Sequence, residues 1–511
     1  MTDWTDGYVA DIGYTYGYYT ELNPLRVRLA FLNAGLVCPD FGTACELGFG
    51  QGVSANFHAA ASVTNWHGTD FNPSQAGLAQ QLARDAGAGA QLYDEAFSDF
   101  ANRTDLPEFD YVGLHGIWSW ISDENRAVIT EFLRKKLKVG GVLYISYNTL
   151  PGINSVAPMR HLLTEHSGVM GAEGEGIVSR IEGSLDFTEK LFAIAPKIAE
   201  ANPKLASRLE KFKTADRHYL AHEYFNLDWK PMYFAGMVEC LSQAKVSFAC
   251  SANYLDHVEQ LQLTAEQQEF LKDIHDSTFK QTVRDYMVNQ PFRKDYWVKG
   301  ARSLSVLEKT EALRAQRLVL TTPRDDVELK VVGSLGEATL KESVYVPILD
   351  ELADHKVRTI EQLAEAVKPL ELSFEQVVQA VMVMTGAGHV NAVQDDAIVT
   401  QARPHSDLIN NHVMLKSRSG KEISFLVSPL TGGGIAASRF EQLFLLAIQR
   451  GNKKPEGWAE FVSQILLEQK QKIIKDGKAL NTDAENLAEL NIRAKEFSEK
   501  RLPIMKALKI I

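Results

Sequence analysis

Short runs of residues alternate with amphipathic segments between Leu36 and Tyr147. Each run has the length of a buried strand, and each segment between two runs carries apolar residues at helical spacing. The predicted strands are Thr43–Leu47, Asn65–Thr69, Ala90–Tyr93, Tyr111–Leu114 and Val142–Ser146, and the predicted helices are Ser54–Ser62, Pro73–Ala86 and Asp123–Leu137. Strands that alternate with helices predict a doubly wound α/β domain with a parallel sheet.

The remainder of the chain follows other patterns. Residues 176–300 are predicted to be helical, including Arg180–Phe192 and Lys204–Leu220. A small antiparallel meander (318–320, 327–332, 338–341) precedes a winged-helix-like order of segments (346–352, 359–367, 373–385, 386–393), and the stretch after about Ser438 is again helical. The predicted divisions are an aromatic N-terminal cap at 1–35, an α/β domain at 36–175, a helical domain at 176–300, a meander with a winged-helix-like domain at 301–400, and a mainly helical domain at 401–511.

Composition and charge narrow the class of protein. The 511 residues are 45% hydrophobic and 23% charged, which is typical of a folded protein of three or four domains. A net charge of -11 gives no overall attraction for nucleic acid, and the third winged-helix segment, FEQVVQAVMVMTG, has no Lys or Arg to meet phosphates. We therefore expect a structural module there and no nucleic-acid partner.

Targeting and metal-binding signals are weak in this sequence. The N-terminus lacks a basic and apolar leader, and no stretch reaches about 18 apolar residues, so we expect a cytoplasmic protein without a membrane span. The four cysteines lack CxxC spacing, so no metal site is expected. His222-Glu223 lacks the second His of HExxH, which makes a zinc protease improbable and favours a structural pair at a helix end.

The strongest chemical signal is a glycine-rich loop at the end of the first predicted strand. Glu46-Leu47-Gly48-Phe49-Gly50-Gln51-Gly52 precedes a helix, and Asp70 ends the second strand. Glycines let the backbone approach a ligand at a helix N-terminus, and an acidic residue at the next strand end can accept hydrogen bonds from both ribose hydroxyls. Together they predict a nucleoside pocket.

The glycine spacing distinguishes two nucleoside cofactors. A dinucleotide fingerprint G-x-G-x-x-G would need glycine at position 53, which is Val53, whereas the chain has G-x-G-x-G behind an acidic residue. S-adenosylmethionine (SAM) has no pyrophosphate and carries a sulfonium and an ammonium group. A carboxylate such as Glu46 suits those cations, so SAM is the predicted cofactor.

Longer motifs extend this pattern beyond the loop. They are Tyr14 with Tyr19–Pro24, Phe109–Tyr111 with Leu114–Trp120, Tyr147–Gly152, Tyr219–Phe225, Pro231–Phe234, Gln290–Arg293 and Ser428–Leu430 with Gly433. With these motifs the chain resembles class I SAM-dependent methyltransferases that carry a methyltransferase regulatory domain, including rickettsial lysine methyltransferases that modify outer-membrane proteins. The resemblance covers most of the first 300 residues. It implies a Rossmann-like catalytic domain followed by helical and winged-helix-like domains, an open substrate cavity and a homodimer.

The resemblance also implies roles for individual residues. Cofactor contacts are assigned to Tyr19, Glu46, Gly48, Gly50, Gly52, Asp70, Phe97, Ser98 and His115, with Asp70 at the ribose and Phe97-Ser98 at the adenine. His115, Trp118, Trp120, Tyr147 and Asn148 would face the acceptor as catalytic residues. Trp118 departs from the subfamily, in which Tyr is common. The aromatic segment with Tyr8, Tyr14, Tyr16, Tyr18 and Tyr19 is either a packing strap or part of the ligand site.

A lysine acceptor raises a question of protonation. With a reference pKa near 10.4, making the amine neutral at pH 7 costs roughly 4.6 kcal/mol. A sulfonium about 4 Å away at an effective dielectric of ~20 repels the ammonium by about 4 kcal/mol, so a strong base is not required. Three functions stay open at this point: a protein-lysine methyltransferase, a small-molecule methyltransferase, and a SAM-responsive binding protein without catalysis.

Overall fold

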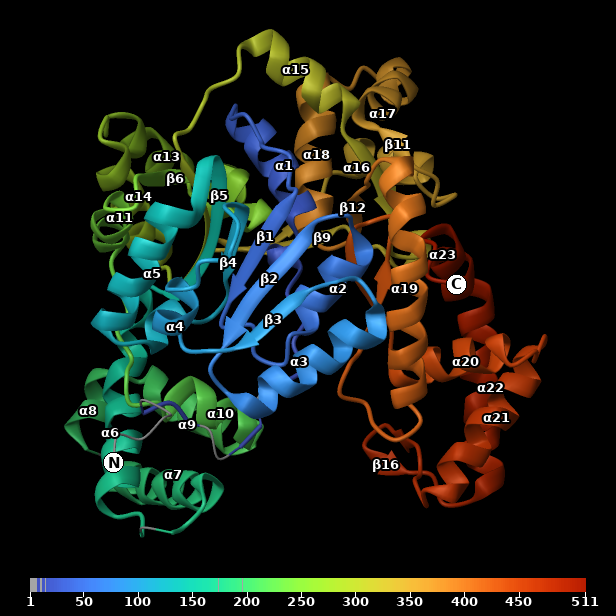
Figure 1. Ribbon diagram of the computed structural model, residues 1–511, viewed down its shortest axis with the longest axis horizontal. Coiled ribbons are helices and arrows are strands. Elements are labelled where there is room, and N and C mark those ends of the chain that lie inside the picture. Colours follow the sequence, from blue (N-terminus) through green and yellow to red (C-terminus); the bar gives the residue numbers. More distant parts are fainter. Residues whose placement is uncertain (1–6, 10–11, 14, 173, 195) are drawn as a thin grey trace.

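A seven-stranded sheet forms the centre of the computed structural model, which describes residues 7–9, 12–13, 15–172, 174–194 and 196–511 (Figure 1). The strand order is β3-β2-β1-β4-β5-β7-β6, and β7 runs in the opposite direction to the other six strands. The strands are β1 (Thr43–Leu47), β2 (Asn65–Asp70), β3 (Gln91–Asp94), β4 (Phe109–Leu114), β5 (Leu137–Asn148), β6 (Val246–Ser251) and β7 (Phe292–Lys299). The predicted α/β domain and its five strands are confirmed, although β5 begins at Leu137, directly after α5, and not at Val142.

Strands β6 and β7 correct the prediction that residues 176–300 are helical. They pair with the edge that β5 leaves open, and Tyr296 and Trp297 of β7 are fully buried on its two sides. The described part of this segment also contains α-helices, of which α8 and α12 are the shortest. They are α7 (Ile177–Ala193), α8 (Lys197–Ala201), α9 (Lys204–Thr214), α10 (Arg217–Tyr224), α11 (Phe234–Ser242), α12 (Glu259–Gln262), α13 (Ala265–Lys272) and α14 (Ser277–Val288). The segment is therefore not wholly helical, because its later part completes the central sheet.

Helices cover both faces of the sheet. On one face, α1 (Pro24–Ala34), α2 (Val53–Ala61) and α3 (Pro73–Ala86) share a core with Ala44 of β1. On the other face, α4 (Phe97–Ala101), α5 (Asp123–Lys136) and α11 share a core with the next residue, Cys45. This alternation is the two-residue period of a strand buried on both sides. It leaves the carboxyl ends of β1, β2 and β4 between the two helix layers.

A small helical bundle has a core of its own. Helices α7, α9 and α10 pack with α6 (Ala157–Val169) around Leu163, Ile181 and Leu209. Figure 1 shows this bundle below the central sheet, where α10 approaches the ends of the strands. The bundle thus brings residues from position 216 onward toward the predicted nucleoside pocket.

Residues 301–400 do not form the expected single meander. β8 (Arg317–Leu320) pairs with β11 (Arg358–Thr359) and β12 (Val390–Ala392), whereas β9 (Lys330–Gly333) and β10 (Gly336–Thr339) form a separate hairpin. The helices are α15 (Val306–Ala315), α16 (Glu342–Glu351), α17 (Ile360–Val367) and α18 (Phe374–Gly386). Capping boxes at Thr359 and Ser373 begin α17 and α18. A winged helix stays a prediction for this region.

The C-terminal region packs on the outer side of α2 and α3. Its long helix α19 (Asp396–Lys416) crosses the predicted boundary at 401, and the Ser406 hydroxyl donates to the Ala60 carbonyl at 2.9 Å. The other elements are β13 (Phe425–Ser428), β14 (Gly433–Ala436), α20 (Arg439–Gln449), α21 (Pro455–Glu468), β15 (Ile474–Lys475), β16 (Lys478–Ala479), α22 (Asp483–Glu496) and α23 (Leu502–Ala507). No helix in the described part of the chain is both long and apolar enough to cross a bilayer.

Candidate active site

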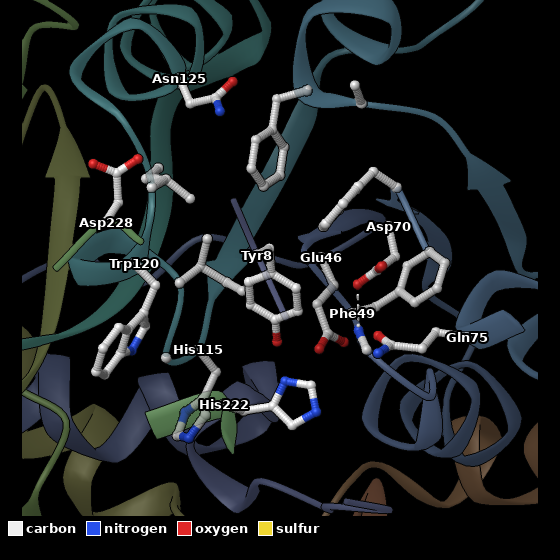
Figure 2. A pocket seen from close by; sticks show the side chains of 18 of the residues that line it. Tyr8, Glu46, Phe49, Asp70, Gln75, His115, Trp120, Asn125, His222 and Asp228 are labelled. Carbon is white, nitrogen blue, oxygen red and sulfur yellow. Dashed lines mark hydrogen bonds between the residues drawn. The ribbon is translucent and has the colours of Figure 1, made fainter. Parts of the chain in front are cut away.

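A cavity of about 620 Å³ opens at the carboxyl ends of β1, β2, β3 and β4 (Figure 2). Ligands of open α/β sheets bind at this edge, so its position agrees with the predicted nucleoside pocket. The lining residues come from the N-terminal segment, from the loops after these strands and from the end of α10 with the loop that follows. They include Tyr8, Tyr19, Glu46, Gly48, Gly50, Asp70, Glu95, Phe97, Ser98, His115, Trp120, His222, Glu223 and Asp228.

The glycine-rich loop is shaped by close packing. Gly48, Gly50 and Gly52 all have positive φ angles, which L side chains rarely adopt. A Cβ on Gly48 would lie 2.6 Å from Cδ1 of Ile117, and a Cβ on Gly52 would lie 2.4 Å from Cβ of Ala79. Gly48 and Gly50 line the cavity, whereas Gly52 does not. The structure therefore gives Gly52 a role in packing α2 against α3.

Asp70 is held rigidly at the end of β2. Its Oδ2 accepts from the Gly50 amide at 2.8 Å, the dashed line in Figure 2, and its Oδ1 accepts from the Asn72 amide at 3.0 Å. Burial raises the pKa of Asp70 to about 7, although these two amides oppose the change. Each carboxylate oxygen keeps a further lone pair, so the group can still accept hydrogen bonds from a ribose.

Glu46 lies at the end of β1 beside Asp70. It is 3% exposed, and its Oε2 has no hydrogen-bond partner among the described residues. Burial and then the charge of Asp70 raise the pKa of Glu46 to about 8. A buried carboxyl without a partner is costly unless a ligand supplies a donor or a positive charge. Glu46 therefore fits the cationic methionine end of SAM.

His115 and Tyr19 form a second part of the wall. Their rings stack with centroids 3.7 Å apart, and His115 Nδ1 lies 2.8 Å from the Tyr144 hydroxyl. Burial lowers the pKa of His115 to about 4, so the ring is neutral at pH 7. Both residues line the cavity, together with Phe97 and Ser98, and their contacts with the cofactor stay a prediction.

Three of the predicted acceptor residues do not reach the cavity. Trp118 is fully buried, with its indole nitrogen 3.3 Å from the Met232 sulfur, and Tyr147 donates to Asp295 Oδ2 at 2.9 Å within the core. The Asn148 side chain accepts from the Trp229 indole at 3.1 Å. Of the residues assigned to the acceptor, only His115 and Trp120 line the cavity. Their assignment as catalytic residues stays a prediction.

The structure adds wall residues that the sequence analysis did not assign. Tyr8 packs against Phe71 and His222, with ring centroids 5.6 and 5.4 Å apart. The two alternatives for the aromatic segment therefore apply to different residues. Tyr8 lines the cavity, whereas Tyr18 packs against Phe57. Tyr14 lies outside the described residues. The sequence favours a structural role for the His222-Glu223 pair, but both residues line the cavity.

The residues present fit SAM. An orphaned carboxylate oxygen lies at Glu46, a doubly anchored carboxylate lies at Asp70, and a backbone cradle at Gly48 and Gly50 leaves no room for a side chain at position 48. These groups would hold the methionine end, the ribose and the bend between them. Figure 2 shows Trp120 and Asp228 on the side of the cavity away from Asp70. That side remains for an acceptor.

Comparisons with known proteins agree with this geometry. Residues 216–299, from α10 through β7, match the family described as a predicted methyltransferase regulatory domain. The Synechocystis protein sll1526 is 40% identical over 512 aligned residues, which span 99% of each chain, and the Rickettsia prowazekii protein RP789 is 24% identical over 54% of this chain and 49% of its own length.

A solved structure supports the same fold. PKMT2 from Rickettsia typhi in complex with AdoHcy superimposes with a TM-score of 0.69 and covers 96% of this chain and 99% of its own, at 18% identity. The likeness extends from the sheet to the C-terminal helices, because it spans nearly all of both chains.

Proposed function

Because this chain belongs to the family of sll1526 and has the fold of class I SAM-dependent methyltransferases, we propose that it methylates lysine side chains of a protein substrate. SAM is its cofactor, bound at the glycine-rich loop and Asp70. The acceptor enters from the side of Trp120 and Asp228. By the resemblance of its motifs to the rickettsial enzymes, the substrate is of the outer-membrane-protein type.

The charge of the cavity wall carries this proposal. Five carboxyl side chains line it, and no Lys or Arg occurs among its described lining residues; the five are Glu46, Asp70, Glu95, Glu223 and Asp228. Burial lowers the pKa values of His115 and His222, which keeps both rings neutral at pH 7. Such a wall offers no cation to a phosphate or carboxylate acceptor, whereas its carboxyl groups can ionise beside a bound cation. A lysine ammonium is the acceptor in proteins that matches it.

The chain's own residues prepare the acceptor for reaction. SAM supplies an electrophilic methyl group and a positive charge that disfavours a second cation beside it. Ile117, Trp120 and Ile121 form an apolar part of the wall, which removes water from an entering amine and lowers its pKa. Transfer then requires the nitrogen to lie about 3–3.5 Å from the methyl carbon, in line with the sulfur.

Labelling distinguishes this function from the alternatives. The protein is incubated with methyl-labelled SAM and either the membrane or the soluble fraction of a lysate, and labelled proteins are hydrolysed to amino acids. We expect label in membrane-fraction proteins, recovered as methyl-lysine. Label only in small molecules indicates a small-molecule methyltransferase, and no transfer at all indicates a binding protein.

Asp70→Ala is the matched control for the labelling. The substitution removes the carboxylate that accepts hydrogen bonds from the Gly50 amide and from the ribose hydroxyls. Calorimetry should therefore detect no SAM binding, and all labelling should stop. Unchanged SAM affinity in this variant would remove the assignment of the pocket.

A further inference from the structure

Glu223 projects from the regulatory domain into the active-site cavity. It lies in the last turn of α10, next to His222, whose Nε2 lies 3.1 Å from the Ile12 carbonyl oxygen. Within the described part of the chain, the Glu223 carboxylate takes part in no hydrogen bond or ion pair. Its charge acts on the Tyr8 hydroxyl, as does the charge of Asp70. Glu223 therefore lines the same cavity as Tyr8, near enough for its charge to act on the Tyr8 hydroxyl.

Each of the other four carboxyls that line the cavity has either a partner in the protein or an assigned role in binding SAM. Asp70 is anchored by two amides, and Glu46 lies beside it at the end assigned to SAM. Glu95 pairs with Arg103 at 2.6 Å. Asp228 lies on the side of the cavity away from Asp70 (Figure 2), and its charge acts on the guanidinium groups of Arg126 and Arg160. Among the five, Glu223 is the carboxyl that is neither assigned to the cofactor nor influenced by a neighbouring cation.

We infer that Glu223 is the catalytic base that takes the proton of the acceptor lysine, an inference that rests on the proposed function. A proton passes from the lysine ammonium to the Glu223 carboxylate, which becomes neutral. The freed nitrogen lone pair forms the new N–C bond as the methyl–sulfur bond breaks, and that electron pair goes to sulfur. The product is a charged methyl-lysine and a neutral thioether, and the proton on Glu223 leaves to water.

The surroundings of Glu223 suit a base that works at neutral pH. Burial raises the pKa of Glu223 to about 7, so the group is partly ionised at pH 7 and holds a proton well once it receives one. The charge of Glu223 acts on Tyr8 of the N-terminal segment and on Tyr219 of α10. The other titratable groups that line the cavity are Tyr19, Glu46, Asp70, Glu95, His115, His222 and Asp228. Tyr8 stays neutral because burial raises its pKa, and burial lowers the pKa of His222, so neither supplies a cation to Glu223.

The test compares Glu223→Gln, Glu223→Asp and the control Glu210→Gln. Glu210 is an exposed residue of α9, outside the cavity. Each full-length variant is assayed from pH 5.5 to 10 at saturating SAM, with the lysate protein that the wild-type enzyme labels as substrate. SAM affinity is measured by calorimetry, which also shows that each variant is folded.

A base at Glu223 predicts a specific pattern. Wild-type kcat should rise with pH through about 7, because protonated Glu223 cannot accept a proton. Glu223→Gln should lose about 100-fold or more in kcat at pH 7.5, keep its SAM affinity within threefold, and show a rate that climbs steadily toward pH 10 as the amine itself loses its proton. Glu223→Asp should recover part of kcat, and Glu210→Gln should match the wild type.

Two contrary results have different meanings. If Glu223→Gln keeps kcat within twofold and the same rise through pH 7, the inference falls while the lysine methyltransferase function stands. If the wild-type enzyme labels no lysine at all, the proposed function falls and the inference falls with it.

Discussion

At the scale of single residues, the candidate site depends on which side chains turn toward the cavity. The short helical turn Trp118–Trp120 buries its first indole in the core and presents the second to the cavity. A three-residue turn has no established polar face, so the sequence could not distinguish the two. Glu46 and Asp70 were predictable because a loop of glycines and a strand end fix their positions from nearby residues.

Glu46 should make the protein less stable as the pH rises. Its pKa, about 8 in the folded chain against 4.5 for an unperturbed group, means that the folded state binds an extra proton between these pH values. The free energy of unfolding therefore falls as pH rises through that window, and the loss is complete above about pH 8. Glu46→Gln removes the titration. We expect the variant to be more stable than the wild type by roughly 1–3 kcal/mol at pH 8.5 and nearly equal at pH 4.5.

Urea unfolding of the ligand-free protein at the two pH values measures this effect. Glu210→Gln, an exposed substitution of the same kind, should change neither value. An equal gain for Glu46→Gln at both pH values would contradict the buried-carboxyl argument.

At the scale of elements, local pattern and long-range pairing differ in how well the sequence reveals them. The strands from β1 to β5 and helices α2, α3 and α5 follow from the spacing of apolar residues within each segment. β6 and β7 were missed because the first half of β7 carries Arg293, Lys294 and Asp295 in place of an apolar run, and because their partner is the distant edge of β5. The sequence leaves Tyr8 open between packing and ligand binding, favours a structural role for His222-Glu223 and does not single out Asp228. The reason is the same, because the N-terminal segment and α10 meet the cavity only in the folded chain.

The contact between α2 and α3 gives a prediction at this scale. Gly52→Ala places a Cβ 2.4 Å from Cβ of Ala79 and requires a non-glycine residue at φ +69°. The clash pushes the two helices apart and the positive φ strains the backbone, so we expect a loss of about 1–3 kcal/mol in the free energy of unfolding. Urea unfolding measures the loss.

Two further variants separate crowding from backbone strain. Adding Ala79→Gly to Gly52→Ala should recover part of the loss, because it removes the clash and leaves the strained φ. Gly77→Ala, in α3 with open space around its Cβ, should stabilise the protein by up to about 1 kcal/mol. No recovery in the double variant would show that the two helices are not in close contact at this point.

At the scale of the whole molecule, the predicted divisions of the chain merge into a structure with shared cores. The segment matched by the regulatory family supplies two strands of the central sheet, and the C-terminal region covers the outer side of α2 and α3. Tyr18, Phe57 and Leu82 from the first hundred residues share one hydrophobic core with α19 and the helices after it. Composition and length predicted several domains, but they could not show that these domains have cores in common.

Shared cores predict that cofactor binding stabilises the C-terminal region. A ligand that binds only the folded state raises the free energy of unfolding by about 2.7 kcal/mol at 100 times its Kd. Because α19 packs on α2 and α3, calorimetry should show one main unfolding transition that moves upward as a whole with S-adenosylhomocysteine. Ile409→Ala, in the buried face of α19, should lower that same transition by about 2–4 kcal/mol, whereas Leu408→Ala, at the half-exposed neighbouring position, should lower it far less. The contrary result is a separate C-terminal unfolding transition that does not shift with ligand and is the one transition lowered by Ile409→Ala. That result would mean that the two regions unfold independently and that their shared core contributes little to holding the cofactor loop in place.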